Sequence, residues 1–251
     1  MLKRNVAALL ISAALPIAGY SGQQDPLESP LWDHMRAKFI GDQKYVFDSN
    51  VKVTVPEFAE DPTQVPITVN AEALAGKIDK IVVFADLNPI QHIFTYYPHK
   101  EIVPHLSMRI KVQQGTAIRA AVLSKSGVWH LGGSYLDAAG GGCTTPSAAA
   151  ANTYWQDHLG EMKSKFFPRE QGGRYKLKVV HPMDTGLVSS IPEFYIENVE
   201  VRNFEGAPLA KLELSQPVSE NPVLTFDVRD GSQGHRIWMR DNGGNEFENA
   251  L

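Results

Sequence analysis

The chain has 251 residues, of which 43% are apolar and 21% are charged, with 24 basic and 28 acidic side chains and a net charge of −4. This length allows one or two domains, and the apolar fraction is sufficient for hydrophobic cores. A predominantly disordered chain is excluded because the apolar content is ordinary and the net charge is small. A pI of about 6.1 argues against nucleic-acid binding, which requires clustered lysine and arginine.

The first residues have the pattern of an export signal. Lys3 and Arg4 form a positive start, an apolar run follows over residues 6–17, and small residues precede Gly22 where a signal peptidase requires them. The apolar run is too short to span a hydrocarbon core of about 30 Å, so stable membrane insertion is not expected. We predict a cleaved signal peptide over residues 1–21 and a periplasmic location, with an uncleaved N-terminal anchor as the alternative.

A short amphipathic helix is predicted next. The Ser29-Pro30 pair is suited to a helix start, and Leu31, Met35 and Phe39 recur at the spacing of one helix face. We expect this face to pack on the domain that follows.

From residue 51 the apolar period changes to two, which is typical of strands with one buried face. Proline or glycine clusters interrupt the runs about every ten residues, a spacing that favours an antiparallel sandwich or barrel. A parallel α/β sheet is disfavoured because no helical pattern lies between the runs. The predicted strands of this block are 51–55, 65–69, 78–84, 106–112, 116–123 and 128–136.

Cys143, the only cysteine, follows this first block. A single cysteine cannot form an internal disulfide, so it is a buried apolar residue, a crosslink between two copies, or a thiol kept for chemistry. Gly140, Gly141 and Gly142 precede it and Thr144-Thr145-Pro146 follow. Because no flanking side chain can pack it into a core, we predict that Cys143 is exposed.

A linker and a second strand-rich block complete the chain. The linker is predicted to contain a helix over residues 152–165, with Trp155, Leu159 and Met162 on one face. The predicted strands of the second block are 175–180, 194–202, 210–214, 223–228, 236–240 and 246–251. The fold class is therefore all-β, with two β domains.

Motifs in both blocks resemble the subunits of the bacterial sulfur-oxidation (Sox) carrier. The second block resembles the Z subunit through Val180-His181-Pro182-Met183-Asp184-Thr185-Gly186, Ile191-Pro192, Ser219-Glu220-Asn221-Pro222 and Asp241-Asn242-Gly243-Gly244. The first block resembles the Y subunit through Val65-Pro66-Ile67, Phe84-Ala85-Asp86-Leu87-Asn88-Pro89 and Gly141-Gly142-Cys143. One exported chain with both parts resembles the fused SoxYZ-like carriers associated with quinoprotein dehydrogenases.

This resemblance implies two immunoglobulin-like β-sandwiches joined by a Gly/Ala-rich, partly helical linker. The implied organisation is a signal peptide over 1–21, an N-terminal helical segment over 22–50, a SoxY-like sandwich over 51–142, a carrier-thiol loop and linker over 143–173, and a SoxZ-like sandwich over 174–251. It also implies that Cys143 holds a sulfur intermediate covalently on a flexible arm of Gly140, Gly141 and Gly142. In the Y subunit this motif ends the chain, whereas here a second domain follows, which shortens the reach of the thiol.

The surroundings of Cys143 in the sequence favour carriage over catalysis. A catalytic cysteine needs a nearby base or cation that lowers its pKa, and no charged residue or histidine lies within five residues on either side. His130 and His181 are distant candidates to approach it in the folded chain. We therefore expect no catalytic residue, and a carrier on which partner enzymes act rather than an enzyme.

No metal or cofactor is expected. The histidines are not at metal-ligand spacing, so we interpret them as loop or partly buried residues that form hydrogen bonds; a copper site that uses Met183 or Met239 is left open. They are His34, His92, His99, His105, His130, His158, His181 and His235. The segment 181–186 is interpreted as a strand end and turn with a structural or domain-contact role.

Two functional hypotheses follow. The first is a periplasmic carrier of sulfur-containing intermediates on Cys143, served by Sox-type or quinoprotein dehydrogenase enzymes and c-type cytochromes. The second is an accessory module that docks on a quinoprotein dehydrogenase, with the cysteine incidental. A homodimer linked through Cys143 is a further option.

Overall fold

The computed structural model describes residues 23–148, 153–229 and 234–251, so the predicted signal peptide over 1–21 lies outside the described residues. The helices are α1 (Trp32–Phe39), η1 (Glu72–Leu74) and α2 (Tyr154–His158). The strands of the first half are β1 (Tyr45–Phe47), β2 (Lys52–Thr54), β3 (Phe58–Ala59), β4 (Val65–Asn70), β5 (Ile78–Ala85), β6 (His92–Pro98), β7 (Ile102–Ile110), β8 (Thr116–Ser124) and β9 (Trp129–Ala138). Those of the second half are β10 (Met162–Pro168), β11 (Gly173–Val179), β12 (Ile196–Arg202), β13 (Pro208–Leu214), β14 (Val223–Val228), β15 (Arg236–Asp241) and β16 (Glu246–Ala250).

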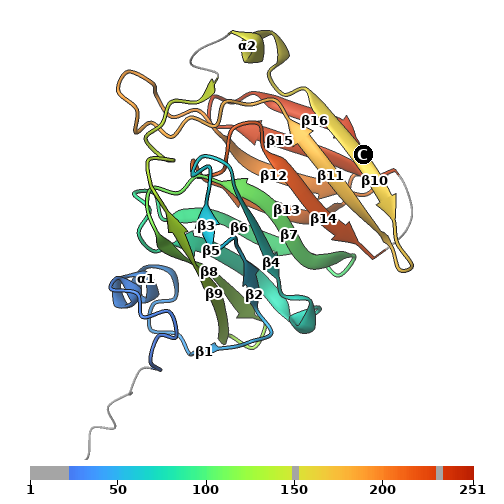
Figure 1. Cartoon of the computed structure of the whole chain (residues 1–251). Helices are drawn as coiled ribbons and strands as arrows, with labels where there is room; N and C mark the ends of the chain where they lie inside the picture. Colours follow the sequence, from blue (N-terminus) through green and yellow to red (C-terminus); the bar gives the residue numbers. More distant parts are fainter. Residues whose placement is uncertain (1–22, 149–152, 230–233) are drawn as a thin grey trace, which may run out of the picture.

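The strands form two sheets (Figure 1). A ten-stranded sheet has the order β1-β9-β8-β5-β6-β13-β12-β15-β16, with β3 also paired to β9, and a six-stranded sheet has the order β10-β11-β14-β7-β4-β2. Neighbouring strands are antiparallel except where β1 and β3 pair with β9. The predicted all-β, immunoglobulin-like sandwich class is confirmed. In the described residues, no helix is long and apolar enough to cross a membrane.

Both sheets run continuously through the two halves of the chain. In the ten-stranded sheet β6 pairs with β13, and in the six-stranded sheet β7 pairs with β14. The two sandwiches are thus joined edge to edge, because main-chain hydrogen bonds connect them in each layer. This joint fixes the register between segments that are far apart in the sequence.

Alternating side chains from both sheets meet in one hydrophobic core. Val83 and Val199 enter it from the ten-stranded sheet, and Ile67 and Leu224 enter it from the six-stranded sheet. The burial of β4 alternates along the strand, as the period of two predicts. Each large apolar side chain buried in this way stabilises the fold by about 1.5–3 kcal/mol. Because the core contains side chains from both halves, each half contributes to the stability of the other.

Helix α1 covers the opposite face of the ten-stranded sheet. Trp32 and Met35 are buried against side chains of β5, β8 and β9, and the ring of Phe39 stacks on that of Phe84 with centroids 4.3 Å apart. The prediction that this helix packs on the following domain is confirmed. It begins at Trp32 rather than at the Ser29-Pro30 pair, without a side-chain cap.

A buried ion-pair network fastens the segment before α1. Arg119 on β8 donates to Asp86 at 3.0 Å and to Asp25 at 2.6 and 2.8 Å. Its guanidinium also lies 4.6 Å from the centre of the Trp32 ring. All three charged residues are buried, so each depends on the others for compensation of its charge.

Every predicted strand range overlaps an observed strand, and the missed strands have physical reasons. β6 is buried on both sides over Ile93, Phe94, Thr95 and Tyr96, so it lacks the alternation that marks a half-exposed strand. β1 and β3 are short and attach to β9. These two strands form because β9 offers an edge to pair with, and such a tertiary contact cannot be read from the local sequence.

The helix predicted over residues 152–165 is mostly wrong. Asn152 lies outside the described residues, α2 ends at His158, and β10 begins at Met162. Between them, Gly160 has a positive φ of 79°, and a Cβ at this position would overlap the ring of Phe247. β10 then pairs along its full length with β11, so the predicted linker over 143–173 contains a strand of the second half.

Replacing Arg119 by alanine will strongly destabilise the fold. The change leaves Asp25 and Asp86 buried without their cation, which costs about 3–5 kcal/mol. Arg240→Ala is the matched control, because Arg240 is half exposed and lies 3.8 Å from Glu197; its loss should cost less than about 1 kcal/mol. Urea unfolding followed by fluorescence measures both values. Equal losses would contradict the importance of the buried network.

Candidate functional site

Cys143 lies in a hydrogen-bonded turn that follows β9. The backbone of Gly141 donates to the carbonyl of Gln113 at 3.0 Å, and that of Gly142 donates to the carbonyl of Val112 at 3.0 Å. The turn is therefore attached to the connection between β7 and β8. In this structure the glycine segment is held by hydrogen bonds at Gly141 and Gly142 and does not project as a free arm.

The prediction that Cys143 is exposed is wrong for this conformation. The residue has 0% exposure, although its sequence neighbours offer no apolar side chain. Its surroundings come instead from distant segments, including Lys111 of the first half and Thr185 of the second. The prediction considered only adjacent residues, whereas tertiary packing supplies the cover. Covalent attachment at Cys143 stays a prediction.

The glycines before Cys143 allow a close approach of two chain segments. A Cβ on Gly142 would lie 2.1 Å from the carbonyl oxygen of Pro62 and 2.5 Å from that of Val112. Gly140 and Gly141 have positive φ angles of 108° and 91°, which favour glycine. These positions therefore require glycine for a tight turn in the described state, and flexibility of the arm stays a prediction.

Lys111 is the cation beside the thiol. The Cys143 sulfhydryl donates to the carbonyl of Lys111 with a sulfur–oxygen distance of 3.6 Å. The side chain of Lys111 is buried, with 4% of the residue exposed, and its ammonium donates to the carbonyl of Met183. Burial lowers the pKa of Lys111, and the charge of Asp184 opposes this shift most strongly.

Burial controls the acidity of the thiol. It raises the pKa of Cys143 from an ordinary value of 9.0 to about 11, against the opposing effect of the Lys111 charge. At pH 7 the thiolate fraction is then on the order of one in ten thousand. Since the thiolate is the nucleophile, Cys143 is unreactive while the turn is closed.

The second half of the chain closes over the turn. The hydroxyl of Thr185 donates to the carbonyl of Cys143 at 2.8 Å, and that of Ser147 donates to the Asp184 carboxylate at 2.8 Å. The segment 181–186 was predicted to have a structural or domain-contact role, and the geometry confirms a contact between the halves. The thiol thus lies where the two halves meet.

The distant histidines are not hydrogen-bonded to the sulfur in the described structure. His130 on β9 pairs with Asp48 at 2.8 Å. His181 is buried and accepts a hydrogen bond from the Met183 backbone at 3.1 Å. Burial lowers the pKa of His181 to about 4, although the Asp241 carboxylate opposes the shift. His181 is therefore neutral at ordinary pH.

The described residues contain no group of three or more His, Cys, Asp and Glu side chains placed to hold a metal ion. The sulfur of Met183 accepts a hydrogen bond from the Ile196 backbone. The hydrogen-bonding role expected of the histidines is confirmed for His92 with Ser215, His105 with Asp227, His130 with Asp48, His158 with Glu161, His181 with Met183 and His235 with Tyr175.

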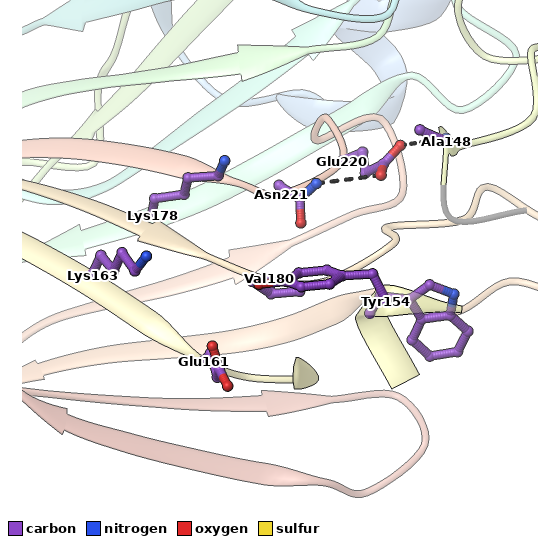
Figure 2. A pocket seen from close by; sticks show the side chains of 9 residues that line it. Ala148, Tyr154, Glu161, Lys163, Lys178, Val180, Glu220 and Asn221 are labelled. Atoms are coloured by element: carbon purple, nitrogen blue, oxygen red, sulfur yellow. Dashed lines mark hydrogen bonds between the residues drawn. The ribbon is translucent and has the colours of Figure 1, made fainter. Parts of the chain in front are cut away.

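A cavity of about 290 Å³ is lined in part by residues that follow the thiol turn in the sequence (Figure 2). Ala148 is at its border, and the Ala148 backbone donates to the carboxylate of Glu220 at 2.6 Å. Trp155 of α2 and the side chains of Lys163 and Lys178 also line it. The cavity is thus built mainly by the segment after Cys143 and by the β10–β11 pair.

Two protein families match the chain in succession. The family described as sulfur oxidation protein SoxY matches residues 36–143, and the family described as sulphur oxidation protein SoxZ matches residues 168–251. The chain is a fused SoxYZ-like protein. Membership of both families supports a carrier role in sulfur oxidation. The SoxY match ends at Cys143, and the unmatched residues 144–167 contain α2 and most of β10.

Solved structures show weaker similarity. The sulfur carrier protein SoxY from Chlorobium limicola f thiosulfatophilum has 20% identity and a TM-score of 0.37, with 42% of this chain and 93% of that chain covered. The beta-glucuronidase of Parabacteroides merdae has 10% identity and a TM-score of 0.26, with 80% and 24% covered. Neither similarity is close enough to support a functional argument. No curated protein matches the chain significantly.

Sequence reasoning missed the polar residues that support the turn. Asn88, within the first-block motif, is buried; its amide donates to the carbonyl of Lys111 at 3.0 Å and accepts from the Gln113 backbone at 2.9 Å. The sequence gave no indication that Lys111 lies beside the thiol, because the predicted strand over 106–112 places this residue in a solvent-facing position. The strand ends at Ile110, and this end turns the lysine inward.

Gly142→Ala will open the thiol turn. The added methyl group collides with two backbone carbonyls, so the turn shifts outward and Cys143 reacts at least about tenfold faster with 5,5′-dithiobis(2-nitrobenzoate) at pH 8. Gly244→Ala is the control, because a Cβ at Gly244, in the turn between β15 and β16, has no atom within 4 Å, although its positive φ strains any residue with a Cβ. An unchanged rate in Gly142→Ala would show that the close packing does not protect the sulfur.

The stability of the protein will depend on the thiol at high pH. Because the pKa is raised in the folded state, the unfolded thiol ionises first as the pH rises above about 9, and the free energy of unfolding falls until about pH 11. Below pH 9 this contribution is fully present. Urea unfolding at pH 8 and 11 should show a fall larger by about 2 kcal/mol in the wild type than in Cys143→Ser. Equal falls in the two proteins would contradict a buried neutral thiol.

Proposed function

We propose that this chain is a periplasmic carrier that holds sulfur-containing intermediates covalently on Cys143 while partner oxidising enzymes act on them. The observation that carries the proposal is the position of the thiol. The SoxY match ends at Cys143, and this single cysteine lies at the contact between the SoxY and SoxZ halves.

Carriage on this thiol requires two conformations. In the closed conformation, contacts to Lys111 and Thr185 cover the turn, and no partner can reach the sulfur. Loading therefore requires the turn to move away from Lys111 and Thr185. The contacts that must break are a few hydrogen bonds, each with a net contribution of about 0.5–1.5 kcal/mol, so opening is within reach of the binding energy of a partner.

The pattern of residues 1–21 supports a periplasmic location. The partners we propose are Sox-type enzymes, with quinoprotein dehydrogenases and c-type cytochromes as the partners of the fused carriers that the sequence resembles. The protein itself would supply the attachment point and the docking surfaces. A homodimer through Cys143 would need both turns to open.

The burial of Cys143 favours one alternative. An accessory module that docks on a quinoprotein dehydrogenase would use the surfaces of the sandwich, and its cysteine would be an inert buried residue. The pKa of about 11 fits such a residue as well as it fits a carrier thiol in its closed state. The two functions differ in whether the sulfur is ever modified.

Intact-mass spectrometry of the protein from native cells will separate the two functions. If the protein is a carrier, then protein from cells grown on a reduced sulfur compound should show mass additions that a reductant removes and that Cys143→Ser abolishes. Thr185→Val is an additional variant, because losing its hydroxyl removes the bond to the Cys143 carbonyl and should raise the modified fraction. Protein that carries only free thiol under all conditions, with a host phenotype that survives Cys143→Ser, would refute the carrier and support the accessory module.

A further inference from the structure

The outer face of the six-stranded sheet is strongly basic. On each strand, the residues that alternate with core side chains point to this face. Its exposed basic residues are Lys163 and Lys165 on β10, Lys176 and Lys178 on β11, Arg109 on β7 and Lys52 on β2. Among the described strand residues of the face, Asp227 is the only carboxylate, and Arg174 pairs with it at 2.6 Å. This concentration occurs in a chain with a net charge of −4.

The four lysines of β10 and β11 repel one another in pairs. Lys163 lies directly opposite Lys178, and Lys165 lies directly opposite Lys176; we call these four residues the lysine face. Like charges in directly opposite positions destabilise a strand pair. Within the described residues, none of the four forms an ion pair, although the ammonium of Lys165 lies 5.0 Å from the centre of the Phe167 ring. The fold thus retains a repulsion that contributes nothing to its stability.

Protection of a free sheet edge explains only half of this pattern. Lysines on an edge strand prevent pairing with other chains, and β10 is an edge strand. β11 lies inside the sheet, between β10 and β14, so Lys176 and Lys178 protect no edge. The lysine face therefore needs another reason.

We propose that the lysine face is the docking surface for an acidic protein, namely an enzyme that loads or unloads Cys143; this inference rests on the proposed function. Neighbouring strands are about 4.8 Å apart and alternate residues about 6.8 Å apart. The four ammonium groups thus form a flat array, which suits a surface with several carboxylates better than one small anion. A membrane would require several inserted apolar side chains. The exposed large hydrophobic side chains beside the array are Phe167, at 39% exposure, and Tyr154, at 58%, which lines the same cavity as Lys163 and Lys178, so vesicle binding is included as an outcome of the test below.

The position of the lysine face fits this role. Lys163 and Lys178 line the same cavity as Ala148 (Figure 2), and Ala148 belongs to the segment that leads away from Cys143. A partner held on the lysines lies beside the segment that must move for the thiol to open. Complementary charge also speeds the encounter between the two proteins.

Binding to a defined acidic polypeptide tests the surface. Labelled poly-L-glutamate is titrated with the full-length protein at low salt and followed by fluorescence anisotropy. Lys163→Glu/Lys178→Glu should weaken binding at least about tenfold, whereas Lys44→Glu/Lys77→Glu, which makes the same charge change at exposed sites next to β1 and β5, should weaken it less than about threefold. Equal loss in both variants, or tighter binding to phosphatidylglycerol vesicles than to the polypeptide, would overturn the proposal.

A single reversal keeps the test independent of folding. Lys178→Glu converts the repulsive pair with Lys163 into an attractive one, so the midpoint of thermal unfolding should rise by about 1–3 °C while poly-L-glutamate binding falls. A variant that is more stable and binds less shows that the lysine serves docking. Unchanged binding in this stable variant contradicts it.

A pulse–chase experiment in cells connects docking to the thiol. Thiosulfate is added and then removed, and the Cys143 adduct is followed by intact mass. Either its appearance or its loss should slow at least about fivefold in Lys163→Glu/Lys178→Glu and remain normal in Lys44→Glu/Lys77→Glu. Normal rates in both variants overturn the docking surface while the carrier stands. Absence of any adduct in the wild type refutes the carrier. In that case the polypeptide titration by itself decides whether the lysine face is a docking surface.

Discussion

The structure depends on two strand pairings, β6 with β13 and β7 with β14. They join the halves of the chain in both layers at once, so neither half can slide or rotate without breaking main-chain hydrogen bonds and exposing a shared core. The connection after β7 and the segment 181–186 are thereby brought together. The position of Cys143 follows from this joint, because its turn fits between those two segments.

The surroundings of the thiol are polar but enclosed. Asn88 and Lys111 satisfy backbone carbonyls on one side, and Thr185 satisfies the carbonyl of Cys143 itself on the other. Hydrogen bonds between buried groups hold one arrangement in place, so the closed turn is a defined state. In the proposed carrier, the sulfur would be protected from oxidation while the turn is closed and accessible only while the turn is open.

The segment that connects the two halves begins directly after Cys143. Residues 144–167 lie outside both family matches, yet they provide α2, a wall of the cavity in Figure 2 and the edge strand β10. In this chain, the motif is followed by a segment that returns to the sheet as β10. That segment restricts the reach of the thiol and also adds two lysines to the basic face.

The sequence by itself determined the fold class and most of the strands, and it contains the single cysteine on which the proposed function rests. Those features depend on local alternation, on turn residues and on the presence of a single cysteine, all of which are visible without coordinates. It did not reveal β6, β10 or the burial of Cys143. A strand buried on both faces has no alternation, an added edge strand needs an edge elsewhere in the chain, and Lys111 faces inward because β7 ends at Ile110. Only the tertiary structure decided whether the thiol is open or closed, because Lys111 and Thr185, which cover it, lie 32 and 42 positions away from it in the sequence.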